Sequence, residues 1–178
     1  MTFDELYDEH FDFVWRSLRR LGVPAADLHD VAQEVFLVVH RRLADFEERS
    51  KVTTWLFRIA LHAARDRRRR AHVRREVLDT TTLEHSIDPA IDATVLLERR
   101  DDLALFDDAL DTMDLDQRAV FTLFELEGMS GGEIADTLEI PLGTAYSRLR
   151  LARNAFRRAV LREEARRRGP RVVVGGGP

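Results

Sequence analysis

Apolar residues recur at intervals of three and four along almost the whole of this chain, the spacing that places side chains on one face of an α-helix. The pattern is clear over residues 6–21, 28–39 and 55–63, and it returns between residues 96 and 160. Residues that start or stop helices stand between these segments. The pattern therefore predicts an all-α fold in which each helix buries one apolar face.

Helix boundaries follow from local sequence signals. The expected starts are a capping box at Thr2 and Glu5, the pair Pro24 and Asp27, and Thr53 or Thr54. Gly22 is expected to end the first helix, because glycine readily adopts the left-handed conformation that follows a helix C-terminus. Residues 45–53 lack periodicity and are expected to form a loop before the third helix.

The predicted helices fall into two groups. Residues 1–76 form a first domain, whose third helix runs into an arginine cluster, and residues 77–95 form an acidic linker with little periodicity. Residues 96–165 form a second, smaller domain. The tail, residues 166–178, ends in three glycines and a proline and is expected to be disordered. The expected architecture is two small helical domains joined by an acidic linker.

The second domain contains a predicted helix-turn-helix. Ser130 and Glu133 have the spacing of a capping box that starts a short helix, and Pro141 interrupts the chain after it. A second helix, expected from Thr144, has a narrow apolar stripe and an arginine-rich outer face. Such a helix suits the major groove of DNA, although the same shape also occurs as a plain packing unit.

Composition narrows the class of protein. The sequence has no cysteine, which excludes a disulfide framework and a thiolate zinc site, and its net charge is -4. Basic charge is concentrated in residues 65–75 and from residue 148 onward, whereas residues 76–116 are acidic. The sequence has no signal peptide and no apolar run of membrane-spanning length, so a cytoplasmic protein is expected.

Two sets of motifs carry a family resemblance. The first comprises residues 27–36 (DLHDVAQEVF), 54–60 (TWLFRIA) and 66–70 (DRRRR). The second comprises residues 116–123 (DQRAVFTL), 128–135 (GMSGGEIA) and 141–153 (PLGTAYSRLRLAR). In this order and spacing, the chain resembles bacterial RNA polymerase sigma factors of the extracytoplasmic-function (ECF), two-domain group.

The resemblance implies a function in transcription initiation. The N-terminal domain would bind core RNA polymerase and open the -10 promoter element, and the C-terminal domain would read the -35 element. The implied partners are core RNA polymerase, promoter DNA and an anti-sigma factor. No cofactor, metal or catalytic role is implied, because the polymerase performs the chemistry.

The resemblance also assigns site residues by position. The polymerase-binding face is expected on the second helix, at Asp30, Gln33, Glu34 and Leu37. Bases of the single-stranded -10 element are expected at Phe46, Ser50, Lys51, Thr53 and His62. Phosphates just upstream are expected at Arg65, Arg67, Arg68, Arg69 and Arg70. The -35 element is expected at Thr144, Tyr146, Ser147, Arg148, Arg150 and Leu151.

Three of these positions depart from the family pattern. His62 stands where the family often has asparagine, which affects the preferred -10 base. Tyr146 replaces a commonly basic residue and Leu151 a frequent arginine, so a different -35 sequence is expected, read partly through thymine methyl groups. Trp55, one turn into the third helix, is assigned to the core rather than to base stacking.

Two other functions fit part of the sequence. A helix-turn-helix regulator that acts without polymerase would account for residues 116–160 and leave the N-terminal motifs unused. A metal-dependent hydrolase could use His29, Asp30, Glu34 and His40. The sequence, however, has no H-E-x-x-H motif, no glycine-rich phosphate loop and no nucleophile motif, so we expect a protein that is not an enzyme.

Overall fold

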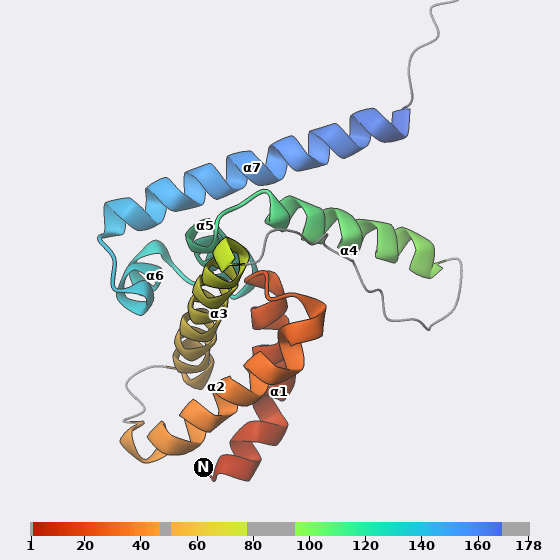
Figure 1. The fold of residues 1–178 in the computed structure, drawn as a ribbon. Helices are drawn as coiled ribbons and strands as arrows, with labels where there is room; N and C mark the ends of the chain where they lie inside the picture. Colours follow the sequence, from red (N-terminus) through yellow and green to blue (C-terminus); the bar gives the residue numbers. More distant parts are fainter. Residues whose placement is uncertain (1, 47–50, 78–94, 169–178) are drawn as a thin grey trace, which may run out of the picture.

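The computed structural model describes residues 2–46, 51–77 and 95–168, and within these ranges every regular element is a helix (Figure 1). The N-terminal helices are α1 (Phe3–Arg20), α2 (Leu28–Arg42) and α3 (Val52–Val77), with 3-10 turns at Ala25–Asp27 and Leu43–Asp45. The C-terminal helices are α4 (Val95–Asp111), α5 (Leu115–Phe121), α6 (Gly131–Leu138) and α7 (Leu142–Arg168). A π-helical turn, Thr122–Leu126, extends α5. The all-α prediction is confirmed.

Both predicted capping boxes form. The Glu5 backbone N–H donates to Thr2 Oγ1 at 3.3 Å, and the Thr2 backbone N–H donates to Glu5 Oε2 at 2.8 Å. The box at α6 has the same two distances, with Glu133 donating to Ser130 Oγ and Ser130 donating to Glu133 Oε2. The backbone hydrogen bond that each carboxylate accepts lowers the pKa of Glu5 and of Glu133.

Two helix starts were predicted too late, that of α3 by one or two residues and that of α7 by two. Helix α3 begins at Val52 rather than at Thr53 or Thr54, because Thr54 N–H already donates to the Lys51 carbonyl at 3.0 Å. Helix α7 begins at Leu142, and Thr144 N–H donates to the Pro141 carbonyl at 2.8 Å. Proline is favourable at such a start because it lacks only a donor that the first turn would leave unpaired.

Parts of the predicted linker and tail lie outside the described residues, as does Ser50. Helix α7 continues to Arg168, so the first three residues of the expected tail are helical. The predicted stop at Gly22 is correct, since this glycine has φ 84°, and Gly128 likewise ends the segment before α6 with φ 66°.

The N-terminal helices pack as a bundle in which α1, α2 and α3 each contact the other two. All five residues predicted for the buried stripe of α2 are buried: Leu28, Val31, Ala32, Val35 and Val39. Phe57 of α3, which was not predicted for the core, is fully buried there as well.

The C-terminal helices pack around α7, which contacts α4, α5 and α6 and lies along α4 at the top of Figure 1. Phe156 of α7 stacks on Phe121 with ring centroids 5.3 Å apart, and it meets Phe106 of α4 edge-on at 5.8 Å. These rings anchor the middle of α7 to the rest of its domain.

The two groups of helices also pack against each other. Leu115, Val120 and Ile134 of the C-terminal helices belong to the same buried apolar cluster as Leu18 and Phe57 of the N-terminal helices. Helix α3 contacts α6 directly. One continuous apolar core therefore spans both groups of helices, and a second, smaller cluster lies within the C-terminal helices, formed by Leu110, Met113, Phe121, Ala152 and Ala155.

Candidate functional site

The expected polymerase-binding residues share one face of α2. Asp30, Gln33 and Leu37 are exposed, and half of the Leu37 surface is open to solvent. Glu34 is half-buried because Arg70 of α3 binds it through two bonds, of 2.9 and 3.3 Å. The carboxylate raises the pKa of Arg70 in return. One expected polymerase contact and one expected phosphate contact thus neutralise each other in this structure.

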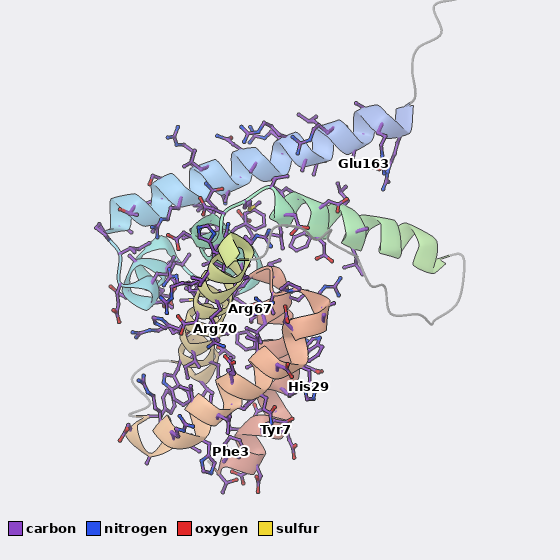
Figure 2. The ribbon with its side chains drawn as sticks, in the orientation of Figure 1. Phe3, Tyr7, His29, Arg67, Arg70 and Glu163 are labelled. Atoms are coloured by element: carbon purple, nitrogen blue, oxygen red, sulfur yellow. The ribbon has the colours of Figure 1, made fainter. Side chains whose placement is uncertain are left out.

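A second arginine of α3 makes a similar connection. Arg67 pairs with Asp27 in the 3-10 turn before α2. Figure 2 labels Arg67 and Arg70, which lie one turn apart on α3. These arginines tie α3 to α2 and its leading turn, which are the elements expected to face polymerase.

An aromatic groove lies beside Gln33 and Leu37, and the sequence analysis missed it. The groove encloses about 420 Å³ and is also lined by Phe3, Tyr7 and Phe11 of α1 and by His29, Phe36 and His40. Ring centroids of Phe3 and Tyr7, both labelled in Figure 2, are 6.1 Å apart, and those of Tyr7 and Phe11 are 5.4 Å apart. The spacing of four residues is visible in the sequence, but it is equally typical of a helix core.

The residues expected to hold -10 bases start at the N-terminal end of α3. Phe46 and Trp55 form a tilted ring pair with centroids 4.9 Å apart. Lys51, which lies between them in the sequence, is exposed. Trp55 packs against the main apolar cluster, so its assignment to the core is supported. Phe46 and Trp55 are both partly buried.

The remaining residues expected at the -10 element lie on two different sides of α3 and far apart along its axis. Thr53 and His62 are nine residues apart, about two and a half turns, so they point to opposite sides of α3. From Thr53 to Arg69 the helix rises by about 24 Å. His62 is exposed on the side that also presents Arg65, whereas Thr53 is half-buried. A single pocket therefore does not contain both Thr53 and His62.

The expected -35 residues separate into two groups on α7. Tyr146, Ser147, Arg150 and Leu151 are all exposed on the outer face. The exposed fraction is 53% for Tyr146 and 48% for Leu151. Arg148 instead points toward α5, where its Nη2 lies 2.7 Å from Asp116 Oδ2. Thr144 is half-buried, and its carbonyl accepts a bond of 2.9 Å from the Ser147 hydroxyl.

Tyr146 owes its position to a glycine of α6. A Cβ atom added to Gly131 would lie 2.6 Å from Tyr146 Cζ and 2.7 Å from its hydroxyl oxygen, which is closer than van der Waals contact allows. The neighbouring Gly132 has open space, with only the Ser130 hydroxyl at 4.0 Å. The tyrosine ring therefore lies over the first residue of α6 only because that residue has no side chain.

Two further arginines extend this outer face. Arg150, Arg153 and Arg157 line one cleft on α7, together with Tyr146, Leu149 and Asn154. Arg153 pairs with Glu125 at 2.6 Å and lies 4.7 Å from the centre of the Phe124 ring. Arg153 follows Arg150 by three residues and Arg157 follows Arg153 by four, and this spacing was the sequence signal for a shared face.

Asp116 connects the two expected DNA surfaces. Its Oδ1 lies 2.8 Å from Arg65 Nη2 of α3, and its Oδ2 lies 2.7 Å from Arg148 Nη2 of α7. We call this arrangement of Arg65, Asp116 and Arg148 the Asp116 bridge. It joins one residue expected at the -10 element to one expected at the -35 element.

Within the part of the chain that the structure describes, three more ion pairs cross between the two groups of helices. Arg20 Nη1 lies 3.2 Å from Glu127 Oε1, and burial is the largest influence on the pKa of Arg20, which it lowers. The other two pairs are Arg19 with Asp107 and Arg58 with Glu139. In all of them the arginine belongs to the N-terminal helices and the acid to the C-terminal helices.

Two other features, a metal site and a membrane span, are absent from the residues that the structure describes. Within residues 2–46, 51–77 and 95–168, no group of three or more histidine, aspartate or glutamate side chains is arranged to hold a metal ion. No helix of the described part combines the length and the apolar character needed to cross a membrane.

Comparison with known proteins accounts for both domains. Residues 6–74 match Sigma-70 region 2, and residues 103–156 match Sigma-70 region 4. The chain is 31% identical to the ECF RNA polymerase sigma-E factor of Escherichia coli over 141 residues, which cover 75% of this chain and 74% of that protein. The chain belongs to the ECF group of RNA polymerase sigma factors.

Two further likenesses agree with this assignment. The RNA polymerase sigma factor NccH of Alcaligenes xylosoxydans xylosoxydans is 30% identical over 158 residues, covering 85% of this sigma factor and 83% of NccH. The fold resembles that of the sigma factor RpoE from Bartonella quintana, solved in complex with the anti-sigma factor NepR, with a TM-score of 0.74 and 23% identity. That similarity covers 89% of this chain and 96% of the other.

The family membership confirms the function expected from the sequence. This sigma factor binds core RNA polymerase and directs promoter-specific transcription initiation. A helix-turn-helix regulator that never binds polymerase does not account for the match of residues 6–74 to region 2.

Proposed function

We propose that this sigma factor contacts core polymerase through α2 and the aromatic groove beside it. The single observation that carries the proposal is the exposed row of Asp30, Gln33 and Leu37 next to the open ring of Tyr7, which is 39% exposed. Acidic and amide groups around exposed apolar surface suit a partner that offers basic and apolar side chains. Glu34 contributes to this face only as far as Arg70 releases it.

We propose that the -10 element binds in two places on α3. Phe46, Ser50, Lys51 and Thr53 would receive extruded bases near the start of the helix. His62 would border a separate base site farther along, and Arg65, Arg68 and Arg69 would contact the phosphates beyond it. The separation of Thr53 from His62 along and around α3 supports two sites rather than one.

We propose that the -35 element is read by the outer face of α7. Tyr146, Ser147, Arg150 and Leu151 would approach base edges in the major groove, while Arg148 and Thr144 would contact phosphates. Arg153 and Arg157 continue the same basic face and are added to the phosphate contacts. The exposure of this row and the arginine-lined cleft beside it support the assignment.

The proposed role requires no catalytic activity of the sigma factor itself. The protein would act in the cytoplasm, where polymerase and promoters are found, and would not be an enzyme. An anti-sigma factor is proposed as its regulator, in keeping with the ECF group.

The affinity of variants for core polymerase tests the proposed polymerase face. Gln33→Ala combined with Leu37→Asp should reduce core-polymerase affinity by about tenfold or more, as expected for residues at the centre of an interface. Glu9→Gln, an exposed change elsewhere on α1, serves as the control. Unchanged affinity in the double variant, with the fold intact by circular dichroism, would remove α2 from the polymerase interface.

A further inference from the structure

The π-helical turn between α5 and α6 places two consecutive side chains against one arginine of α7. The turn comprises Thr122–Leu126 and follows α5 directly. Glu125 Oε1 accepts a hydrogen bond of 2.6 Å from Arg153 Nε, and the centre of the Phe124 ring lies 4.7 Å from Arg153 Cζ. Single π-helical turns occur frequently at functional sites. These two contacts are therefore candidates for a role beyond folding.

The contacts leave one edge of the Arg153 guanidinium group available. Its Nε is bonded to the carboxylate and one face of its plane lies over the ring, but neither Nη atom has a hydrogen-bond partner among the residues that the structure describes. The two Nη groups form an edge that can bind a phosphate group through two parallel hydrogen bonds. The Arg153 side chain is 47% exposed and that of Glu125 is 33% exposed. Glu125 thus restrains the arginine without occupying the edge that suits a phosphate.

The neighbours of Arg153 on α7 are not restrained in this way. Arg150, Arg153 and Arg157 line one cleft of about 300 Å³. Arg150 and Arg157 are exposed, and neither forms an ion pair with any residue in the described ranges. An unrestrained arginine loses rotamer freedom when it binds a ligand, which lowers affinity by about two- to tenfold. Arg153 has already lost part of this freedom in the structure.

We propose that Glu125 is a positioning residue for the -35 element, because it fixes Arg153, over the Phe124 ring, in an orientation that binds a DNA phosphate. The proposal rests on the phosphate contact proposed above for Arg153. The carboxylate also brings a negative charge toward DNA, which by itself opposes binding. Restraint and repulsion have opposite signs, so the direction of the change on removing Glu125 distinguishes a positioning acid from one that merely competes with DNA.

Binding of the holoenzyme to DNA tests the proposal. The holoenzyme is assembled from each sigma variant and core polymerase, and the probe is a promoter duplex that the parent holoenzyme has selected from a random library. Glu125→Ala removes the carboxylate. The matched control is Asp136→Ala on α6, which removes an exposed carboxylate that forms no ion pair within the described residues. Glu125→Gln removes the charge but keeps an acceptor oxygen.

Glu125→Ala should weaken binding by about two- to tenfold, although it removes a negative charge. Asp136→Ala should bind as tightly as the parent or slightly more tightly. Glu125→Gln should lie between Glu125→Ala and the parent, because its amide oxygen can still accept from Arg153 Nε. If Glu125→Ala binds as tightly as Asp136→Ala, or more tightly, the proposal is overturned, since the glutamate would then only compete with DNA.

A double-variant cycle with Arg153→Ala separates positioning from a general effect on the fold. Arg153→Ala alone should weaken binding by about tenfold or more and should lower the salt dependence by about one unit of slope. Adding Glu125→Ala to it should cause no further loss. A second loss of equal size would mean that Glu125 supports the fold of the domain, and the positioning role would be refuted. If circular dichroism finds Glu125→Ala unfolded, Glu125→Gln in the same cycle gives the decision by the same criterion.

The same measurements distinguish failure of this inference from failure of the proposed DNA contact. An Arg153→Ala variant that binds like the parent would refute the phosphate contact of Arg153. Weakened binding by Arg153→Ala, together with unchanged binding by Glu125→Ala, would leave the phosphate contact standing and refute the positioning role alone.

Discussion

At the scale of single residues, neighbours on α7 have different freedom to contact DNA. Arg150 is exposed on the outer face, whereas Arg148, two residues earlier, is turned toward Asp116. Tyr146 shares the outer face with Arg150 but is held over the start of α6 by the absence of a side chain at Gly131. The positions of the residues that we propose to read the -35 element are therefore partly set by residues outside that surface.

Gly131→Ala should change -35 preference without weakening the fold. The new methyl group would displace the Tyr146 ring, while alanine at a helix start is at least as favourable as glycine, by up to about 1 kcal/mol. Selection of bound sequences from a random duplex library measures the preference. Gly132→Ala, which meets open space in the same turn, is the matched control and should select the same sequences as the parent. Identical selections from both alanine variants would show that the ring position has no influence on reading.

Arg150→Ala and Arg148→Ala should weaken DNA binding in different ways. Loss of an arginine that binds a base edge costs about 1–3 kcal/mol and relaxes preference at one or two -35 positions. Loss of a phosphate contact weakens all sequences alike and lowers the salt dependence of binding by about one unit of slope. Binding measured across a salt series, on matched and mismatched duplexes, separates the two. The reverse outcome would mean that Arg148 rotates into the groove when it leaves Asp116.

At the scale of elements, each domain contains a helix that begins with a capping box: α1 in the N-terminal domain and α6 in the C-terminal domain. Ser130→Ala removes the side-chain acceptor at the start of α6 and should destabilise the helix-turn-helix by about 0.5–2 kcal/mol. Duplex -35 binding should fall as a result. Thr2→Ala makes the same change at α1, and binding to the isolated -35 duplex should be unaffected. Equal losses in both variants would mean that the two helix starts are coupled.

The same box has a predicted pH dependence. Because the folded-state pKa of Glu133 lies below its ordinary value of 4.5, its contribution to stability is present above that value and is lost as the pH falls through the lower, folded-state pKa. The difference in melting temperature between Ser130→Ala and the parent should therefore be full at neutral pH and should shrink in acid. A difference that stays constant into acid would exclude Glu133 from the cap.

The elements also show which parts of the structure local sequence can predict. The capping boxes and the glycine stops were correct because each depends on residues three or four positions apart. The starts of α3 and α7 were misplaced by one or two residues because Lys51 and Pro141 accept the first helical hydrogen bonds through their backbone carbonyls, and any residue type can do that. The buried stripe of α2 followed from periodicity alone.

Contacts between distant parts of the chain were not predictable in the same way. Nothing in the local sequence around Glu34 indicates that Arg70 binds it, or that Asp116 lies between Arg65 and Arg148. These pairs depend on how the helices cross, which periodicity does not determine. The family resemblance predicts where the binding surfaces lie, but it gives no information about the acidic side chains that pair with their arginines in this structure.

At the scale of the whole molecule, the continuous core predicts a single unfolding event. Both tryptophans, Trp15 and Trp55, lie in the N-terminal helices, so tryptophan fluorescence reports on that domain alone. Far-UV circular dichroism reports on both domains. The two thermal transitions should coincide at low salt, because Leu115, Val120 and Ile134 share one buried cluster with the N-terminal core. Two separate midpoints would show that the domains unfold independently.

The polarity of the interdomain ion pairs has a consequence for how sigma factors of this design can change over generations. Since, in the interdomain pairs of the described residues, every arginine comes from one domain and every acid from the other, a mutation that reverses one charge sets like charges against each other unless its complement changes in a different part of the gene. Domains exchanged by recombination would carry this matching with them. A hybrid that joined this N-terminal domain to a C-terminal domain with basic residues at the positions of Asp116 and Glu139 would set like charges against Arg65 and Arg58, so its two domains would pack less stably against each other.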